Sequence, residues 1–97
     1  MRAITLADIE VAARVLVCVP PADRRDLMQK LVCSADTADR YRKKMGRQHL
    51  TLGSGTLMSA AQSYPKTRRH GYLGSDMLHA ISIVVSDLAE RCTSHAK

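Results

Sequence analysis

Eight basic side chains and no acidic one lie between positions 40 and 75, and the chemistry open to such a stretch is anion binding. The flanking segments each carry one more acid than base, so the net charge of +6 comes entirely from the middle of the chain. A charge segregated in this way favours an anionic partner. The candidate binding residues are Arg42, Lys44, Arg47, His49, Lys66, Arg68, Arg69 and His70.

Two kinds of anionic partner fit this stretch: an acidic protein and the phosphate backbone of a nucleic acid. Part of the charge is expected to be neutralised locally, because Asp36 and Asp39 each lie four residues before a base. The chain has no Phe or Trp on which bases could stack. The predicted loop 46–55 is about three times too long for the turn of a helix-turn-helix motif. Contacts with DNA or RNA would therefore be made mainly to the backbone, and their affinity would fall steeply with salt.

Arg42 is the most unusual single position. At about 100° per residue it points in the same direction as Leu31 and Ala35, on the apolar face of a predicted helix. A charge in that position must be paired. Asp39 is the expected partner, in a structural ion pair that fixes the packing of the following loop. The alternative is a small-molecule site between helices that uses Asp39, Arg42 and His49.

A glycine-rich cluster precedes the third predicted helix and consists of Gly53, Ser54, Gly55 and Thr56. Free backbone N–H groups at such a helix start can bind a phosphate or carboxylate. The cluster lacks the lysine of the Walker pattern, and no predicted strand precedes it. The other interpretation is a plain loop in which Ser54 or Thr56 caps the helix.

Catalytic and metal-binding motifs are missing from the sequence. There is no G-x-S-x-G, no C-x-x-C and no H-x-x-x-H spacing, so we expect no enzyme activity, no metal and no cofactor. Cys18, Cys33 and Cys92 are expected to be free, buried thiols in a cytoplasmic protein. We expect no signal peptide and no membrane span, because the longest apolar run, 15–19, is far shorter than the ~20 residues that a span needs.

The elements that must position these residues are helices. At 97 residues the chain is expected to be a single domain, 1–97, whose core is built from Leu, Ile, Val, Met and Ala. Apolar residues at helical spacing predict an all-α fold, a compact bundle of about four helices in which the second is longest. The predicted helices cover residues 6–18, 21–45, 56–63 and 76–91.

The first predicted helix is apolar nearly all round, with only Asp8, Glu10 and Arg14 charged. A helix of this kind is buried on more than one side. It is therefore either the central helix of the bundle or a surface through which the chain forms a homo-oligomer.

Two segments, 38–49 and 53–61, resemble a group of short uncharacterised bacterial proteins. The resemblance consists of an A-D-x-x-R stretch, then G-R-x-H, then a Gly-rich turn before a helix of small residues. Many members have a Pro and a Trp after the histidine, where this chain has Leu50 and Leu52. The resemblance implies no activity. The sequence as a whole predicts a small non-enzymatic interaction module whose basic central surface engages an acidic partner, with nucleic-acid binding as the alternative.

Overall fold

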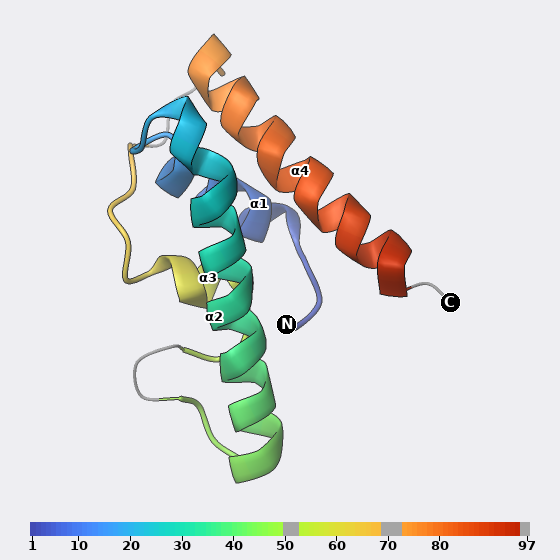
Figure 1. The fold of residues 1–97 in the computed structure, drawn as a ribbon. Coiled ribbons are helices and arrows are strands. Elements are labelled where there is room, and N and C mark those ends of the chain that lie inside the picture. Colours follow the sequence, from blue (N-terminus) through green and yellow to red (C-terminus); the bar gives the residue numbers. More distant parts are fainter. Residues whose placement is uncertain (50–52, 69–72, 96–97) are drawn as a thin grey trace.

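The computed structural model describes residues 1–49, 53–68 and 73–95. In these ranges the chain forms four α-helices and one 3₁₀ turn, and it forms no strand. The elements are α1 (Leu6–Leu16), η1 (Pro21–Asp23), α2 (Arg24–Met45), α3 (Leu57–Ala61) and α4 (Ser75–His95) (Figure 1). The predicted all-α bundle, with its second helix longest, is confirmed. No helix in these ranges is both long and apolar enough to cross a lipid bilayer.

Local sequence signals explain the main helix ends. Thr5 and Asp8 form a complete capping box at the start of α1. The Pro20–Pro21 pair separates α1 from α2, and the second proline begins the 3₁₀ turn that leads into α2. Gly46 ends α2 in the left-handed conformation, at φ 71°.

Several other helix ends differ from the predicted ones. Helix α1 ends two residues earlier, at Leu16, and α3 is shorter at both ends because Thr56 serves as its N-cap. Helix α4 extends beyond Arg91 to His95, because no glycine or proline interrupts it.

Helix α1 is the central helix of the bundle and packs against α2, α3 and α4. This was one of the two interpretations of its apolar sequence. Small side chains on α1 let the other helices approach closely, and its fully buried residues are Ala12, Ala13, Val15 and Leu16. The prediction of buried cysteines is wrong, since all three thiols are exposed. Cys18 lies beyond the end of α1, and the other two face outward from α2 and α4.

A buried arginine joins the starts of α2 and α4 to the end of α1. Arg24 is 1% exposed, and its Nε donates to the carbonyls of Leu16 at 3.0 Å and Val19 at 3.3 Å. Its Nη1 donates to Nδ1 of His79 at 2.8 Å, and its Nη2 to Oδ1 of Asp76 at 2.7 Å. One guanidinium therefore links two carbonyls at and just beyond the end of α1 to the first turns of α4. The Leu16 carbonyl also accepts from the Val19 N–H at 3.2 Å.

A buried carboxylate joins α1 to α3. Asp8 accepts from the backbone N–H of Thr5 at 2.8 Å, as part of the capping box. Its other oxygen accepts from the backbone N–H of Met58, in the first turn of α3, at 3.0 Å. Because Asp8 caps two helices at once, it positions the glycine-rich loop that precedes α3.

Candidate functional site

The candidate site lies at the carboxyl end of α2, where the helix projects beyond the rest of the bundle (Figure 1). Asp39 is the last buried residue of this helix. Four basic side chains beyond it are exposed, and we call them the basic end of α2: Arg40, Lys43, Lys44 and Arg47. Three of them lie in the last turns of α2, where cations are also favoured by the helix dipole.

Local ion pairing neutralises only one cation of the basic end of α2. Lys43 Nζ lies 3.3 Å from Oδ2 of Asp39, as the four-residue spacing predicts. The corresponding pair between Asp36 and Arg40 is not formed, because Asp36 instead holds the terminal ammonium of Met1 at 2.6 Å. In the described part of the chain, the other three cations of the basic end therefore have no acidic partner.

Asp39 is the centre of an ion-pair cluster that supports this end of the helix. Arg42 Nη2 donates to its Oδ1 at 2.9 Å, and the Met1 ammonium lies 3.4 Å from its Oδ2. The hydrogen bond from Arg42 lowers the pKa of Asp39 from 3.8 to about 2, against the opposing effect of burial. The structure thus contains the Asp39–Arg42 pair, but Arg42 is half-buried rather than central to the apolar face. It lies beyond the last buried residue of α2, where there is no more core to face.

Replacing Asp39 with asparagine is expected to lower the free energy of unfolding at neutral pH by about 1–3 kcal/mol, since Arg42 loses its carboxylate. The carboxylate's folded pKa lies below its unfolded one, so its contribution is full above pH 3.8 and is lost as the pH falls towards 2. The Asp39→Asn variant should therefore lose less stability than the wild type between those pH values. Urea unfolding at a series of pH values measures this, with exposed Asp26→Asn as the control. Equal acid sensitivity in wild type and Asp39→Asn would contradict the assignment.

His49 lies beside the basic end of α2. Its ring packs edge-on against Tyr41, with ring centroids 4.7 Å apart, and its backbone N–H donates to the Gly53 carbonyl at 3.2 Å. The ring contact holds His49 against Tyr41 of α2, and the backbone hydrogen bond joins His49 to Gly53. The small-molecule site suggested by Asp39, Arg42 and His49 remains a hypothesis, with two of its three members engaged in the ion-pair cluster.

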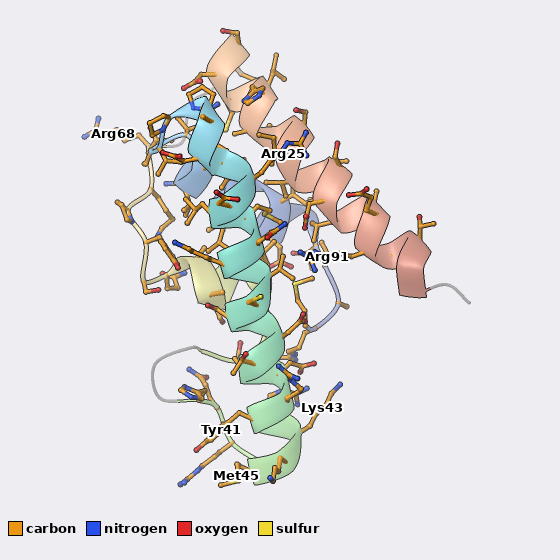
Figure 2. The ribbon with its side chains drawn as sticks, in the orientation of Figure 1. Arg25, Tyr41, Lys43, Met45, Arg68 and Arg91 are labelled. Carbon is orange, nitrogen blue, oxygen red and sulfur yellow. The ribbon has the colours of Figure 1, made fainter. Side chains whose placement is uncertain are left out.

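The second group of predicted basic residues lies elsewhere. Arg68 is near the start of α2, whereas Lys43 is near its end, so the two groups do not form one surface (Figure 2). Lys66 caps the end of α3, because its Nζ donates to the carbonyls of Ala61 at 3.4 Å and Tyr64 at 3.3 Å. Arg69 and His70 lie outside the described residues.

The glycine-rich cluster before α3 is engaged within the chain. Thr56 Oγ1 accepts from the backbone N–H of Ser59 at 3.0 Å, so Thr56 is the N-cap, as the plain-loop interpretation predicted. The N–H of Met58 is taken by Asp8, and Ser54 Oγ shares a hydrogen bond of 2.8 Å with Ser59 Oγ. Two donors that would serve an anion are thus already used.

Metal-ligating side chains are dispersed over the chain. Within the described ranges, no three His, Cys, Asp or Glu residues lie together in a way that could hold a metal ion. The candidate site consists of exposed cations beside the Asp39 ion-pair cluster.

Comparisons with known proteins place the chain in a family. Searches of the curated proteins and of the solved structures found no match. A family model described as a domain of unknown function, DUF7742, matches residues 2–88 and thus includes the basic end of α2 and both segments that resemble uncharacterised proteins. The match covers all four helices except the end of α4. The chain therefore belongs to the DUF7742 family.

Proposed function

We propose that this chain is a small, non-enzymatic interaction module that uses the basic end of α2 to bind an acidic partner protein. The observation that supports this most directly is the cluster of unpaired, exposed cations at the projecting end of one long helix. Among the described residues, the only carboxylate paired with these cations is that of Asp39, which is buried and already shared. The partner's surface would therefore be held by charge–charge contacts at the outer end of the helix.

An exposed apolar residue favours a protein partner over a nucleic acid. Met45 lies among the cations and is 51% exposed. Methionine is a flexible, polarisable side chain that is common at protein-binding surfaces. A helix end that combines Met45 with Lys44 and Arg40 matches an acidic protein segment carrying an apolar residue, whereas a phosphate backbone would leave Met45 without a contact.

The separation of the two basic groups also favours a partner that contacts only a small part of the surface. A protein that binds nucleic acid through about 6–10 phosphate contacts needs a comparable number of cations on one surface. The basic end of α2 provides four exposed cations, and Arg68 lies near the opposite end of the helix. Backbone binding to DNA or RNA is the alternative function, and it would be recognised by a steep fall of affinity with salt.

The proposal also assigns the chain to the cytoplasm, where its three exposed thiols would stay reduced.

The test is fluorescence anisotropy with two labelled probes at about 50 and 200 mM salt. One probe is an acidic peptide with leucines among its Glu and Asp residues, and the other is DNA or RNA of similar charge. We expect the peptide to bind more tightly, and Met45→Ser to weaken the peptide but leave the nucleic acid unaffected. Tighter nucleic-acid binding, lost by orders of magnitude at the higher salt, would establish the alternative. No binding of either probe at the lower salt would overturn both.

A further inference from the structure

The contact between Arg24 and His79 exists for only one protonation state of the histidine. Nη1 of the Arg24 guanidinium lies 2.8 Å from Nδ1 of the His79 ring. A guanidinium keeps its protons in proteins and has only donors, so the ring nitrogen is the acceptor. Nδ1 can accept only when the ring is neutral and carries its proton on Nε2. The contact therefore assigns both the charge and the tautomer of His79.

A proton on Nδ1 of His79 would turn this attraction into a repulsion. The charged ring has no free lone pair, and its positive charge would lie beside a guanidinium that is almost completely buried. Two cations repel each other more strongly where one of them is shielded from water. The Asp76 carboxylate lies 2.7 Å from Nη2 of the same guanidinium, and it offsets only one of the two positive charges.

The other groups around this junction do not provide a partner for a charged His79. The end of α1 offers backbone carbonyls, which accept from Arg24. Arg14, in the last turn of α1, donates instead to the carbonyl of Thr67 at 2.8 Å. Among the described residues, no carboxylate forms an ion pair with His79. The remaining charged residues of η1 and the first turn of α2 are exposed, and they are Asp23, Arg25 and Asp26.

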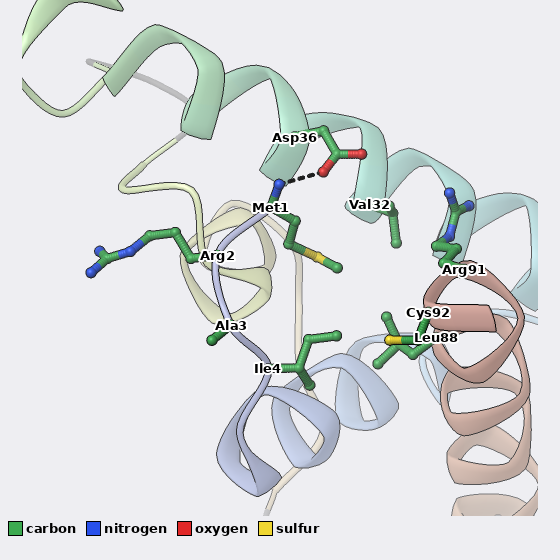
Figure 3. Close-up of a pocket in the computed structure, with 9 residues that line it drawn as sticks. All are labelled: Met1, Arg2, Ala3, Ile4, Val32, Asp36, Leu88, Arg91 and Cys92. Carbon is green, nitrogen blue, oxygen red and sulfur yellow. Dashed lines mark hydrogen bonds and ion pairs between the residues drawn. The ribbon is translucent and has the colours of Figure 1, made fainter. Parts of the chain in front are cut away.

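This junction is the polar link between α2 and α4. In the described part of the chain, the hydrogen bonds between these two helices are those that Arg24 makes with His79 and Asp76. Farther along, an apolar groove of about 470 Å³ lies between α2, the second half of α4 and the N-terminal segment (Figure 3). Arg91, on the wall of this groove, is bonded to Asp87 of its own helix. A change of charge can therefore alter the attachment of α4 to α2 mainly at the start of α4.

We propose that Arg24 and His79 form a pH-sensitive clasp, which holds the start of α4 at neutral pH and loosens in mild acid. Histidine is the side chain that gains its proton between about pH 8 and 5. Above this range the ring is neutral and the contact stabilises the fold. As the pH falls through the range, the contact and its stabilisation are lost.

The release of the clasp is local. His79 is exposed, so its charged ring can turn into water, and the start of α4 should loosen while the apolar core keeps the chain folded. The clasp does not rest on the proposed function, since it uses no residue of the basic end of α2.

The first test is thermal unfolding of the full chain at about pH 7.5 and 5.5, a range in which ordinary carboxylates stay ionised. The melting temperature of the wild type should fall by about 4–8 °C on acidification. His79→Asn keeps a neutral acceptor near the position of Nδ1, so its melting temperature should fall by less than half as much. His49→Asn is the matched control, because it removes a titrating ring beside the other end of α2 and should leave the fall nearly unchanged. Equal falls in the wild type and His79→Asn would overturn the proposal.

A second measurement tests the geometry itself. Nitrogen-15 NMR spectra of the histidine rings at about pH 7.5 should show His79 as the neutral tautomer with its proton on Nε2. On acidification, the backbone amide signals of residues 76–80 should change in the wild type and stay nearly constant in His79→Asn. A ring protonated on Nδ1 at the higher pH would overturn the proposal, and so would amide changes spread evenly over all four helices.

Discussion

Replacing Arg24 with methionine is expected to lower the free energy of unfolding by about 3 kcal/mol, the largest loss from any single side chain considered. The guanidinium is buried and bonded to two carbonyls at the end of α1 and to two side chains of α4. Methionine keeps the apolar stem but removes the guanidinium donors. The Leu16 carbonyl still accepts from the Val19 N–H, whereas the Val19 carbonyl loses the donor that Arg24 supplied, which costs about 1–3 kcal/mol. Loss of the buried ion pair with Asp76 adds to this, and the cost is moderated because Asp76 is 61% exposed and can be hydrated.

Urea unfolding followed by far-UV circular dichroism measures this loss. The neighbouring Arg25→Met is the matched control, because Arg25 is exposed and its replacement should change stability by less than about 0.5 kcal/mol. Arg24→Lys keeps the charge but lacks the planar fork that reaches four partners, so it should recover only part of the loss. An Arg24→Met protein as stable as Arg25→Met would show that the junction of α1, α2 and α4 does not depend on this residue.

Replacing Gly55 with alanine is expected to cost about 2–4 kcal/mol, for two independent reasons. The backbone of Gly55 has φ 95°, which an L-residue adopts only with strain. A Cβ atom there would lie 2.8 Å from Cα of Asp39, which is part of the α2 backbone and cannot rotate away. The loop would have to move, and the hydrogen bond of 2.8 Å from the Arg2 N–H to the Gly55 carbonyl would be lost with it.

Two other glycines allow the effect of positive φ to be measured apart from the effect of the steric clash. Gly46 also has positive φ, but a Cβ there meets nothing within 4 Å, so Gly46→Ala should cost only about 1 kcal/mol. Gly74 has neither restriction, and its replacement should be close to neutral. Thermal unfolding of the three variants should rank them with Gly55→Ala lowest and Gly74→Ala highest. Equal stability of Gly55→Ala and Gly46→Ala would contradict the close contact between the backbone at Gly55 and Asp39.

The sequence predicted the helices because their signals are local. The capping box at Thr5, the proline pair before α2 and Gly46 after it each act within a few residues. The helical spacing of apolar residues also identified the faces that form the core. The ends of α3 and α4 were less accurate, since no strong breaker marks them.

Helical spacing places two arginines on the apolar face of α2, and only one of them is buried. Arg42 shares this face with Leu31 and Ala35, but it lies beyond the buried part of α2 and is half-exposed. Arg24 lies on this face as well, four residues before Met28, and it is the arginine that is buried. The signal in the sequence was therefore present. What the sequence does not contain is the point along the helix at which the core ends.

Contacts between distant segments could not be predicted. Asp8 belongs to the local capping box of α1, but nothing in the sequence indicates that it also caps α3, fifty residues away. The division of the basic stretch into two separate groups also depends on contacts between distant segments. No acidic residue lies between Lys66 or Arg68 and the other cations in the sequence, so all of them belong to one basic stretch. The fold nevertheless places Arg68 near the opposite end of α2.

The most direct test of the proposed function compares two charge reversals at opposite ends of α2. Lys44→Glu changes the basic end, and Arg68→Glu makes the same change in net charge at the other group, with both side chains exposed. Binding of the labelled acidic peptide is measured for each variant at one low salt concentration. We expect Lys44→Glu to weaken binding about tenfold or more and Arg68→Glu to have a much smaller effect. Equal losses in the two variants would mean that net charge alone attracts the peptide, and that the basic end of α2 is not its binding site.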